Sequence, residues 1–242
     1  MIGCDCKTCT SDDPRNQRYR SSVAIQVPGG QMLIDTPPEL RLQLLRAKIP
    51  VVHAVLLTHY HADHLFGLDD VRVFPHRLGG PLPIYCNQET EQMVRRTFAY
   101  AFQDEDFRNT YTFVPQLEFA RIFDGETFGV LGETVLPIPL DHAQFKVLGF
   151  RIGNVAYCTD VSYIPSTSMK MLTDLDVLVL DCLRIKPHPA HFTLQQALEV
   201  IAELQPRQAY LTHLSHDLEY HDIQAQLPDR VQLAYDNLRF TF

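Results

Sequence analysis

Four apolar stretches of this chain end in histidine or aspartate, and this repetition limits the folds that the chain can adopt. The first, AVLLT, runs directly into HYHADH, and the others are PLDH, AYCTD and AYLTH. The polar residues at these ends are His59, His61, Asp63, His64, His142, Asp160 and His213. Because strands hold their ends in place while the following loops turn side chains outward, a fold that gathers these ends would build one shared site.

Imidazole and carboxylate groups in this number indicate a metal site. They suit zinc, manganese or iron, and a carboxylate can bridge two ions. Alternate residues after the strand can turn to one side, so His59 and His61 would meet one ion while Asp63 and His64 meet its neighbour. Two ions roughly 3.5 to 4 Å apart would activate water and stabilise displacement at phosphorus. A solvated polar turn is the alternative for HYHADH, and the later strand ends argue against it.

The composition fits one globular domain. The 242 residues are 45% hydrophobic, which is enough for one sizeable core. The 29 acidic residues outnumber 21 lysines and arginines, and the resulting net charge of −8 disfavours a nucleic-acid surface. No apolar run reaches the roughly 18 residues of a membrane span, and the first residues lack a signal-peptide pattern. We therefore expect a soluble cytoplasmic protein.

The predicted elements mix strands and helices. In chain order they are a hairpin at 21–35, a helix at 37–49, strands at 52–58 and 83–86, a helix at 88–102, a meander of strands over about 112–160, a strand at 176–182, a helix at 193–205, a strand at 208–216 and a hairpin at 230–242. Two β-rich blocks, each followed by helices, predict an α/β sandwich in a single domain over 1–242. Cys86, Cys158 and Cys182 stand alone in apolar strands, where small buried side chains are expected.

The spacing H-x-H-x-D-H at 59–64 resembles the signature of the metallo-β-lactamase fold hydrolases, and the later strand ends follow in matching order. The resemblance covers nearly the whole chain. It implies an αββα sandwich of two mixed sheets with helices outside, and two divalent ions, manganese or zinc, at one edge. By this resemblance the first ion would take His59, His61 and His142, the second Asp63, His64 and His213, and Asp160 would bridge them.

The segment GCDCKTCTSDDPRNQRYRSS resembles the start of a narrower group, the phosphoribosyl cyclic phosphodiesterases. There, three cysteines and a histidine three residues after the last catalytic histidine bind a structural zinc. The matching residues here are Cys4, Cys6, Cys9 and His216. Such a site is closed and tetrahedral, and it would tie the first residues to the loop that carries His213. A thiol cluster without metal is the alternative.

Other roles come from the same resemblance. His191 takes the place of a histidine thought to protonate the leaving group, and we assign catalytic roles to Asp63 and His191. A solvent-facing histidine at a helix entry is the alternative for His191. His188 is a weaker candidate for contact with a substrate phosphate. Asp35 and Asp181 end strands, where they would either fix the tautomer of a ligand imidazole or cap the strand.

The narrower group usually begins with a strand and a glycine- and serine-rich loop before the G-C-x-C motif, and the given sequence shows neither before Gly3. Two alternatives stay open: the true start lies further upstream, or the fold tolerates the loss of the strand. In the second case the edge of the neighbouring strand would be exposed and the substrate contacts of that loop would be missing.

Three functions are compared. The first is hydrolysis of a small phosphodiester, such as phosphoribosyl cyclic phosphate, with Arg15, Arg18 and Arg20 as candidate phosphate contacts. The second is tRNA 3′-end processing, as in tRNase Z, but the sequence shows no basic glycine- and proline-rich arm to hold tRNA. The third is an accessory role like that of the pyrroloquinoline quinone synthesis protein B group. The expected partner is a small-molecule substrate, with a homodimer as one option for assembly.

Overall fold

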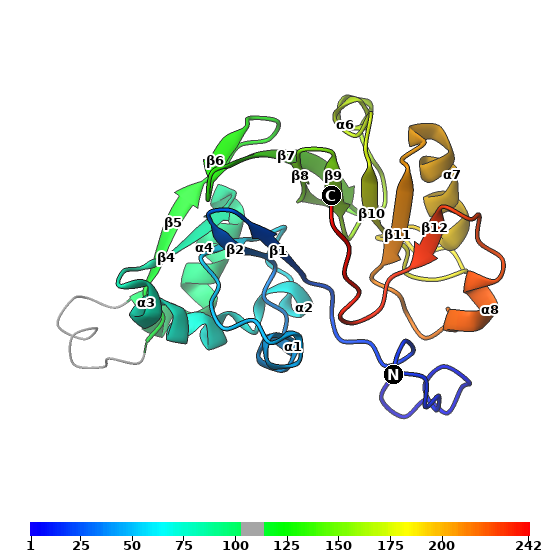
Figure 1. Ribbon diagram of the computed structural model, residues 1–242, viewed down its shortest axis with the longest axis horizontal. Helices are drawn as coiled ribbons and strands as arrows, with labels where there is room; N and C mark the ends of the chain where they lie inside the picture. The colour runs from blue at the N-terminus through cyan, green and yellow to red at the C-terminus, as the bar shows by residue number, and fades with distance from the viewer. Residues whose placement is uncertain (103–113) are drawn as a thin grey trace. The chain divides into compact units, whose positions relative to one another are not determined.

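The computed structural model describes residues 1–102 and 114–242 and divides the chain into two compact units (Figure 1). We call Arg20–Val135 the inner unit, and Met1–Tyr19 together with Leu136–Phe242 the terminal unit, because the latter holds both chain ends. Each unit has its own strands and its own apolar core. That the two units form one domain stays a prediction.

The inner unit is built on a five-stranded sheet in the order β1-β2-β3-β4-β5. The strands are β1 (Val23–Val27), β2 (Gly30–Ile34), β3 (Ala54–Leu56), β4 (Leu82–Cys86) and β5 (Leu117–Arg121). β1 and β2 form the predicted antiparallel hairpin, while β2 to β5 pair in parallel, so the sheet is mixed. The three-residue strand β3 is completely buried, as expected for a central strand of a parallel sheet.

Helical segments join the strands of the inner unit. They are α1 (Leu40–Ala47), α2 (Ala62–Leu65), η1 (Leu68–Arg72), α3 (Val73–Leu78), α4 (Gln88–Thr97) and η2 (Ala99–Phe102). Leu40, Leu65 and Val94 turn from these helices into one apolar cluster with Leu57 and Leu82. The predicted helix at 37–49 is shorter than expected, because Lys48 adopts a left-handed conformation with φ of 57° and ends it.

The terminal unit contains six strands in the order β12-β11-β10-β9-β8-β7. They are β7 (Glu133–His142), β8 (Phe145–Ile152), β9 (Val155–Cys158), β10 (Val177–Asp181), β11 (Gln208–Thr212) and β12 (Val231–Leu233). β9 to β12 are parallel and β8 pairs antiparallel with β9, so this sheet is mixed as well. β6 (Phe128–Val130) pairs with the first residues of β7, within the inner unit.

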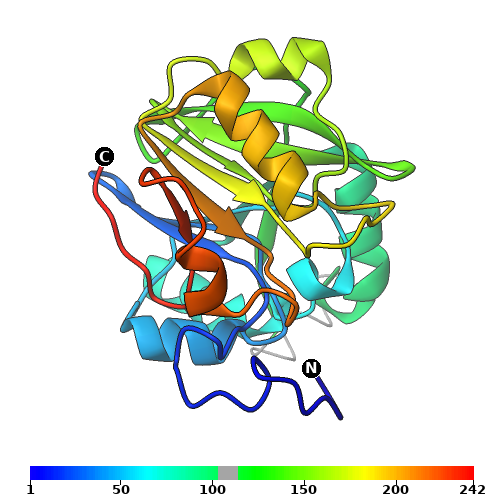
Figure 2. The ribbon, with the colours of Figure 1, turned by 90° about the vertical axis from the view of Figure 1, so that its right-hand side faces the viewer.

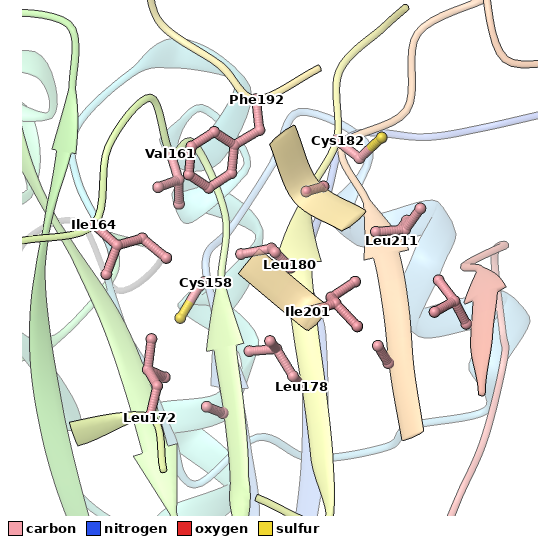
Figure 3. Packing of buried hydrophobic residues seen from close by; sticks show 14 of the residues in the cluster. Cys158, Val161, Ile164, Leu172, Leu178, Leu180, Cys182, Phe192, Ile201 and Leu211 are labelled. Atoms are coloured by element: carbon pink, nitrogen blue, oxygen red, sulfur yellow. The ribbon is translucent and has the colours of Figure 1, made fainter. Parts of the chain in front are cut away.

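Helices cover the terminal-unit sheet, and α7 is the longest of them in the described chain. The helices are α6 (Ser166–Met171), α7 (Leu194–Leu204) and α8 (Tyr220–Gln224). Figure 2 shows α7 lying across the sheet, and Figure 3 shows Ile201 from this helix among Leu178, Leu180 and Leu211 of the strands. Each such side chain, once fully buried, contributes on the order of 1.5–3 kcal/mol. Thr193 begins the helix with a capping box.

Two sequence predictions about strands are wrong. The predicted meander over 112–160 fails at its start, because β5 pairs in parallel with β4 instead of joining the strands that follow; residues 112 and 113 lie outside the described range. The predicted closing hairpin at 230–242 is also absent from the described chain. Only β12 forms there, parallel to β11, and the chain then runs on irregularly until Phe240 stacks on Tyr210 at 4.9 Å.

The three isolated cysteines behave as predicted. Cys86, Cys158 and Cys182 are completely buried and unoxidised. Figure 3 shows Cys158 and Cys182 within the apolar core of the terminal unit. Burial raises the pKa of Cys86 and of Cys158 to about 12, so these thiols stay protonated near neutral pH.

No helix in the described part of the chain is long and apolar enough to cross a membrane.

Candidate metal centre

The histidine run follows β3 in the inner unit. His59 and His64 are buried, and the single turn of α2 carries Asp63 and His64. The ring centroid of His59 lies 4.6 Å from that of His61 and 4.5 Å from that of His64. Asp63 places a carboxylate oxygen 3.6 Å from Nε2 of His64. Three imidazoles and a carboxylate are therefore gathered within one short segment.

A buried aspartate orients two of these imidazoles. Asp35, which follows β2, accepts hydrogen bonds of 2.8 Å from both the amide and the hydroxyl of Thr58, and lies 2.8 Å from Nδ1 of His64. Since the Thr58 hydroxyl gives its hydrogen to Asp35, it accepts one from Nδ1 of His59 at 2.9 Å. Both imidazoles then carry hydrogen on Nδ1, which leaves Nε2 of each to bind a metal. Burial raises the pKa of Asp35, and the hydrogen bond with His64 opposes this shift.

The carboxylate of Asp160 lies among three histidines of the terminal unit, and one of them, His191, places Nε2 3.9 Å from Oδ2. Asp160 follows β9 and is only 2% exposed. One of its oxygens lies 3.7 Å from Nε2 of His142, and the other lies 3.4 Å from Nε2 of His213. A carboxylate whose two oxygens face different imidazoles is suited to bridge two ions.

The tautomer of His142 is fixed by a backbone group. Nδ1 of His142 lies 2.6 Å from the carbonyl oxygen of Ala190. A carbonyl oxygen only accepts, so Nδ1 carries the hydrogen and Nε2, which faces Asp160, is the atom left for a metal. Sequence reasoning did not single out Ala190, because a backbone carbonyl leaves no signal in residue type.

Asp181 is the terminal-unit counterpart of Asp35. It ends β10, is completely buried, and accepts from the amides of Phe192 at 3.0 Å and Asp160 at 3.3 Å. Its Oδ1 lies 3.2 Å from Nδ1 of His191 and 3.7 Å from Nδ1 of His213. Asp35 and Asp181 therefore both lie beside imidazoles, which matches the first of the two roles considered for them in the sequence.

His191 is enclosed by other histidines. Its ring centroid lies 4.6 Å from that of His142 and 4.8 Å from that of His213. It is 8% exposed, so the alternative of a solvent-facing histidine does not describe it. One atom from each of Asp160, Asp181, His191 and His213 lies within 4.8 Å of the others, close enough for a shared metal ion. The geometry thus suits either proton transfer or metal binding by His191.

Three residues among the candidate ligands and their hydrogen-bond partners adopt left-handed backbone conformations. The φ angles are 63° for Asp35, 55° for Asp160 and 59° for His213. Such a conformation in a residue other than glycine costs on the order of 1–3 kcal/mol and persists only where the surroundings impose it. Asp35 and His213 directly follow β2 and β11, and Asp160 stands two residues after the end of β9, so the left-handed turn redirects each side chain near a strand end.

The cysteine cluster also forms within the terminal unit. The ligand atoms of Cys4, Cys6, Cys9 and His216 all lie within 4.8 Å of one another. The sulfurs of Cys4 and Cys6 are both 3.4 Å from Nδ1 of His216. A hydrogen bond from the Cys9 backbone, together with His216, lowers the pKa of Cys6 to about 6. A thiolate is the form that binds metal, and three thiols with one imidazole are a donor set that fits a zinc ion.

Arg15, Arg18 and Arg20 make structural contacts. Arg15 pairs with Asp13, and the Arg20 guanidinium pairs with Glu39. Arg18 donates to the carbonyl oxygens of Ser215 at 2.8 Å and Leu218 at 2.7 Å, on either side of His216. These contacts weaken the prediction that the three arginines bind a substrate phosphate. Arg18 instead holds the loop of the cysteine cluster.

The fold and these donor sets define the class of the protein. The family model of the beta-lactamase superfamily domain matches residues 31–214, and the chain belongs to this family of metallo-β-lactamase fold hydrolases. The predicted fold class is therefore confirmed. Divalent metal binding follows for the family, and the imidazole and carboxylate clusters described above fit it.

Two solved structures show which proteins within this fold the chain resembles. The crystal structure of a new diphosphatase from the PhnP family is 42% identical, with a TM-score of 0.91, and covers 100% of this chain and 91% of that one. Zinc-bound PqqB from Methylobacterium extorquens, at 18% identity and a TM-score of 0.73 over 100% of this chain and 95% of that one, shows the shared fold alone. The similarity to the PhnP family agrees with the narrower group that the cysteine segment indicated.

Curated relatives carry two other names. Octanoyltransferase from Porphyromonas gingivalis is 34% identical over 98% of this chain and 48% of its own length. Ribonuclease Z from Exiguobacterium sp. is 31% identical over 57% of this chain and 44% of its own length. The chain therefore spans about half the length of the curated relatives it matches.

Proposed function

We propose that this protein is a metal-dependent phosphodiesterase acting on a small, cyclic phosphodiester such as phosphoribosyl cyclic phosphate. The observation that carries the proposal is the Asp160 carboxylate, whose oxygens face His142 and His213 separately. A buried carboxylate placed in this way suits two ions, and two ions are the arrangement that assists displacement at phosphorus. The similarity at 42% identity to a PhnP-family diphosphatase supports chemistry at phosphorus.

The proposed ligands come from both units. One ion would take His59, His61 and His142, the other Asp63, His64 and His213, with Asp160 between them. Bound divalent ions would supply an activated water and stabilise the charge that develops on the phosphoryl oxygens. A third ion, zinc, would occupy the cysteine cluster as a structural site.

The protein's own residues prepare the site for this chemistry. Asp35 and the Ala190 carbonyl fix the hydrogen of His64 and of His142 on Nδ1, so Nε2 is the atom of each that would bind a metal. Asp181 accepts from Nδ1 of His191, which leaves Nε2 of His191 as the position from which a proton can pass to a leaving oxygen.

The test is hydrolysis of bis(p-nitrophenyl) phosphate by the purified protein with manganese added. We expect turnover that Asp160→Ala abolishes, because the bridging carboxylate is lost. Asp229→Ala, at an exposed aspartate outside all the clusters described above, is the matched control and should leave turnover unchanged. Activity retained in Asp160→Ala would contradict the two-ion mechanism.

Two other activities are candidates because relatives carry their names. The PhnP-family relative is a diphosphatase, so nucleoside diphosphates are assayed beside the phosphodiester. Ribonuclease Z relatives favour a parallel assay with a tRNA precursor, although the net charge of −8 opposes tRNA binding. An accessory role would show as bound metal without hydrolysis of any of these esters.

A further inference from the structure

We propose that His188 is a substrate-binding residue, which donates a hydrogen bond from Nε2 to an oxygen of the leaving group. The inference deepens the proposed phosphodiesterase function and rests on it. It assigns to the substrate a polar leaving group, such as a sugar, with an acceptor oxygen close to the scissile bond.

The tautomer of His188 is set by the backbone. The amide of Ala190 donates to Nδ1 of His188 at 3.2 Å. Nδ1 is therefore the acceptor, and the neutral ring carries its hydrogen on Nε2. Burial lowers the pKa of His188, which favours this neutral form near pH 7. Among residues 1–102 and 114–242, no hydrogen bond or ion pair to Nε2 of His188 is found, so this donor is available to a ligand.

The position of His188 places this donor beside the candidate proton donor. The ring centroids of His188 and His191 are 5.1 Å apart, and His191 also contacts His142 and His213. Of the three histidines that contact His191 in the described chain, His188 is thus the one with no proposed role as a metal ligand. A group adjacent to the general acid, but outside the metal ligands, is placed to meet the leaving group.

The loop that carries His188 is held in a defined shape. Arg184 donates from Nε to the carbonyl of Lys186 at 3.1 Å and from Nη2 to that of Pro187 at 2.8 Å. The amide of Ala190 donates to Nδ1 of His188, and the carbonyl oxygen of the same residue accepts from Nδ1 of His142. The backbone of Ala190 therefore fixes His188 relative to His142, a candidate metal ligand. A residue that contacts substrate needs such support.

The experiment compares two probes with the manganese-loaded protein. Adenosine 2′,3′-cyclic phosphate has a ribose leaving group with neighbouring oxygens, whereas bis(p-nitrophenyl) phosphate releases a nitrophenolate that needs no such contact. His188→Ala should lower kcat/KM for the cyclic probe about tenfold or more, mainly through KM, as expected when a hydrogen bond to substrate is lost. For the nitrophenyl probe we expect less than about a twofold change.

Two amide variants test which nitrogen is used. His188→Gln places an N–H donor near the position of Nε2 and should restore much of the activity on the cyclic probe, whereas His188→Asn, whose amide reaches only the position of Nδ1, should not. Nitrogen-15 NMR of the zinc-loaded protein provides a readout apart from activity, with hydrogen expected on Nε2 of His188. The pH dependence of kcat should stay unchanged in all three variants, because His188 does not transfer the proton.

The outcomes separate the two levels of the proposal. Hydrolysis of neither probe by the unmodified protein overturns the phosphodiesterase function, and this inference with it. Hydrolysis of the nitrophenyl probe alone overturns only the assignment of a polar leaving group. Equal losses on both probes in His188→Ala, failure of His188→Gln to restore activity, or hydrogen on Nδ1 would show that His188 does not bind substrate in this way.

Discussion

Both units carry candidate metal ligands, but the ligands are arranged differently along the chain in each unit. In the inner unit, four candidate ligands lie within the six residues 59–64, and one buried aspartate orients two of them. In the terminal unit, the candidate ligands follow or end separate strands; the Ala190 carbonyl orients His142, and Asp181 accepts from the amide of Asp160. Ligands within one short segment keep their spacing when the sheet shifts slightly. The spacing of ligands on separate strands depends on the register of those strands.

The largest expected effect comes from removing one ligand of the same ion in each unit. His64→Ala and His213→Ala should each lower activity by more than about 100-fold, because loss of a ligand exceeds the effect expected for an outer partner. In both variants the metal content should also fall by one ion per chain, and the ion lost should be the same. Metal analysis beside kinetics checks this, and different ions lost in the two variants would contradict a shared site.

The two orienting aspartates give a smaller effect. Asp35→Asn and Asp181→Asn should each reduce metal affinity or activity by about 10- to 100-fold, because an amide holds the adjacent imidazole, His64 or His191, less firmly. Asp35→Asn should also destabilise the inner unit, since Asp35 accepts from both groups of Thr58. Urea unfolding and metal titration measure the two effects. Unchanged metal affinity would show that these carboxylates serve only the fold.

Zinc at the cysteine cluster should stabilise the terminal unit and leave the inner unit unaffected. At a free zinc concentration of about a thousand times Kd, the gain is about 4 kcal/mol. Hydrogen exchange should therefore slow around residues 213–222 when zinc is added, and Cys6→Ser should remove the effect. Cys86→Ser is not a suitable control because Cys86 is buried; Thr10→Ser, at an exposed position, serves instead. Equal slowing at 59–64 would contradict a local role.

The smallest effect compares the caps of one helix in each unit. Asn87 accepts from the Thr90 amide at the start of α4, and Thr193 accepts from the Gln196 amide at the start of α7. Asn87→Ala and Thr193→Ala should each cost about 1 kcal/mol of unfolding free energy. Thr193→Ala should cost the more of the two, because it also breaks a capping box. Thermal unfolding measures both, and a reversed order would indicate that α4 depends more on its cap.

Sequence patterns predicted individual strands and helices better than the pairing between strands. The hairpin β1–β2, the strand β10 and the helix α7 were all expected close to where they lie. Alternation and apolar runs describe each strand by itself, so they could not show that β5 pairs in parallel with β4. For the same reason the last residues, which include several apolar side chains, resembled a hairpin although only β12 forms there.

The sequence by itself determined which residue types could bind metal and roughly where each stands at a strand end. His59, His64 and the cysteine segment were evident because their spacing is local. Only the tertiary structure decided which nitrogen each imidazole offers, since that depends on Asp35, Asp181 and the Ala190 carbonyl. The physical reason is that a tautomer is fixed by a hydrogen-bond partner that is distant in the chain, and here one partner is a backbone atom.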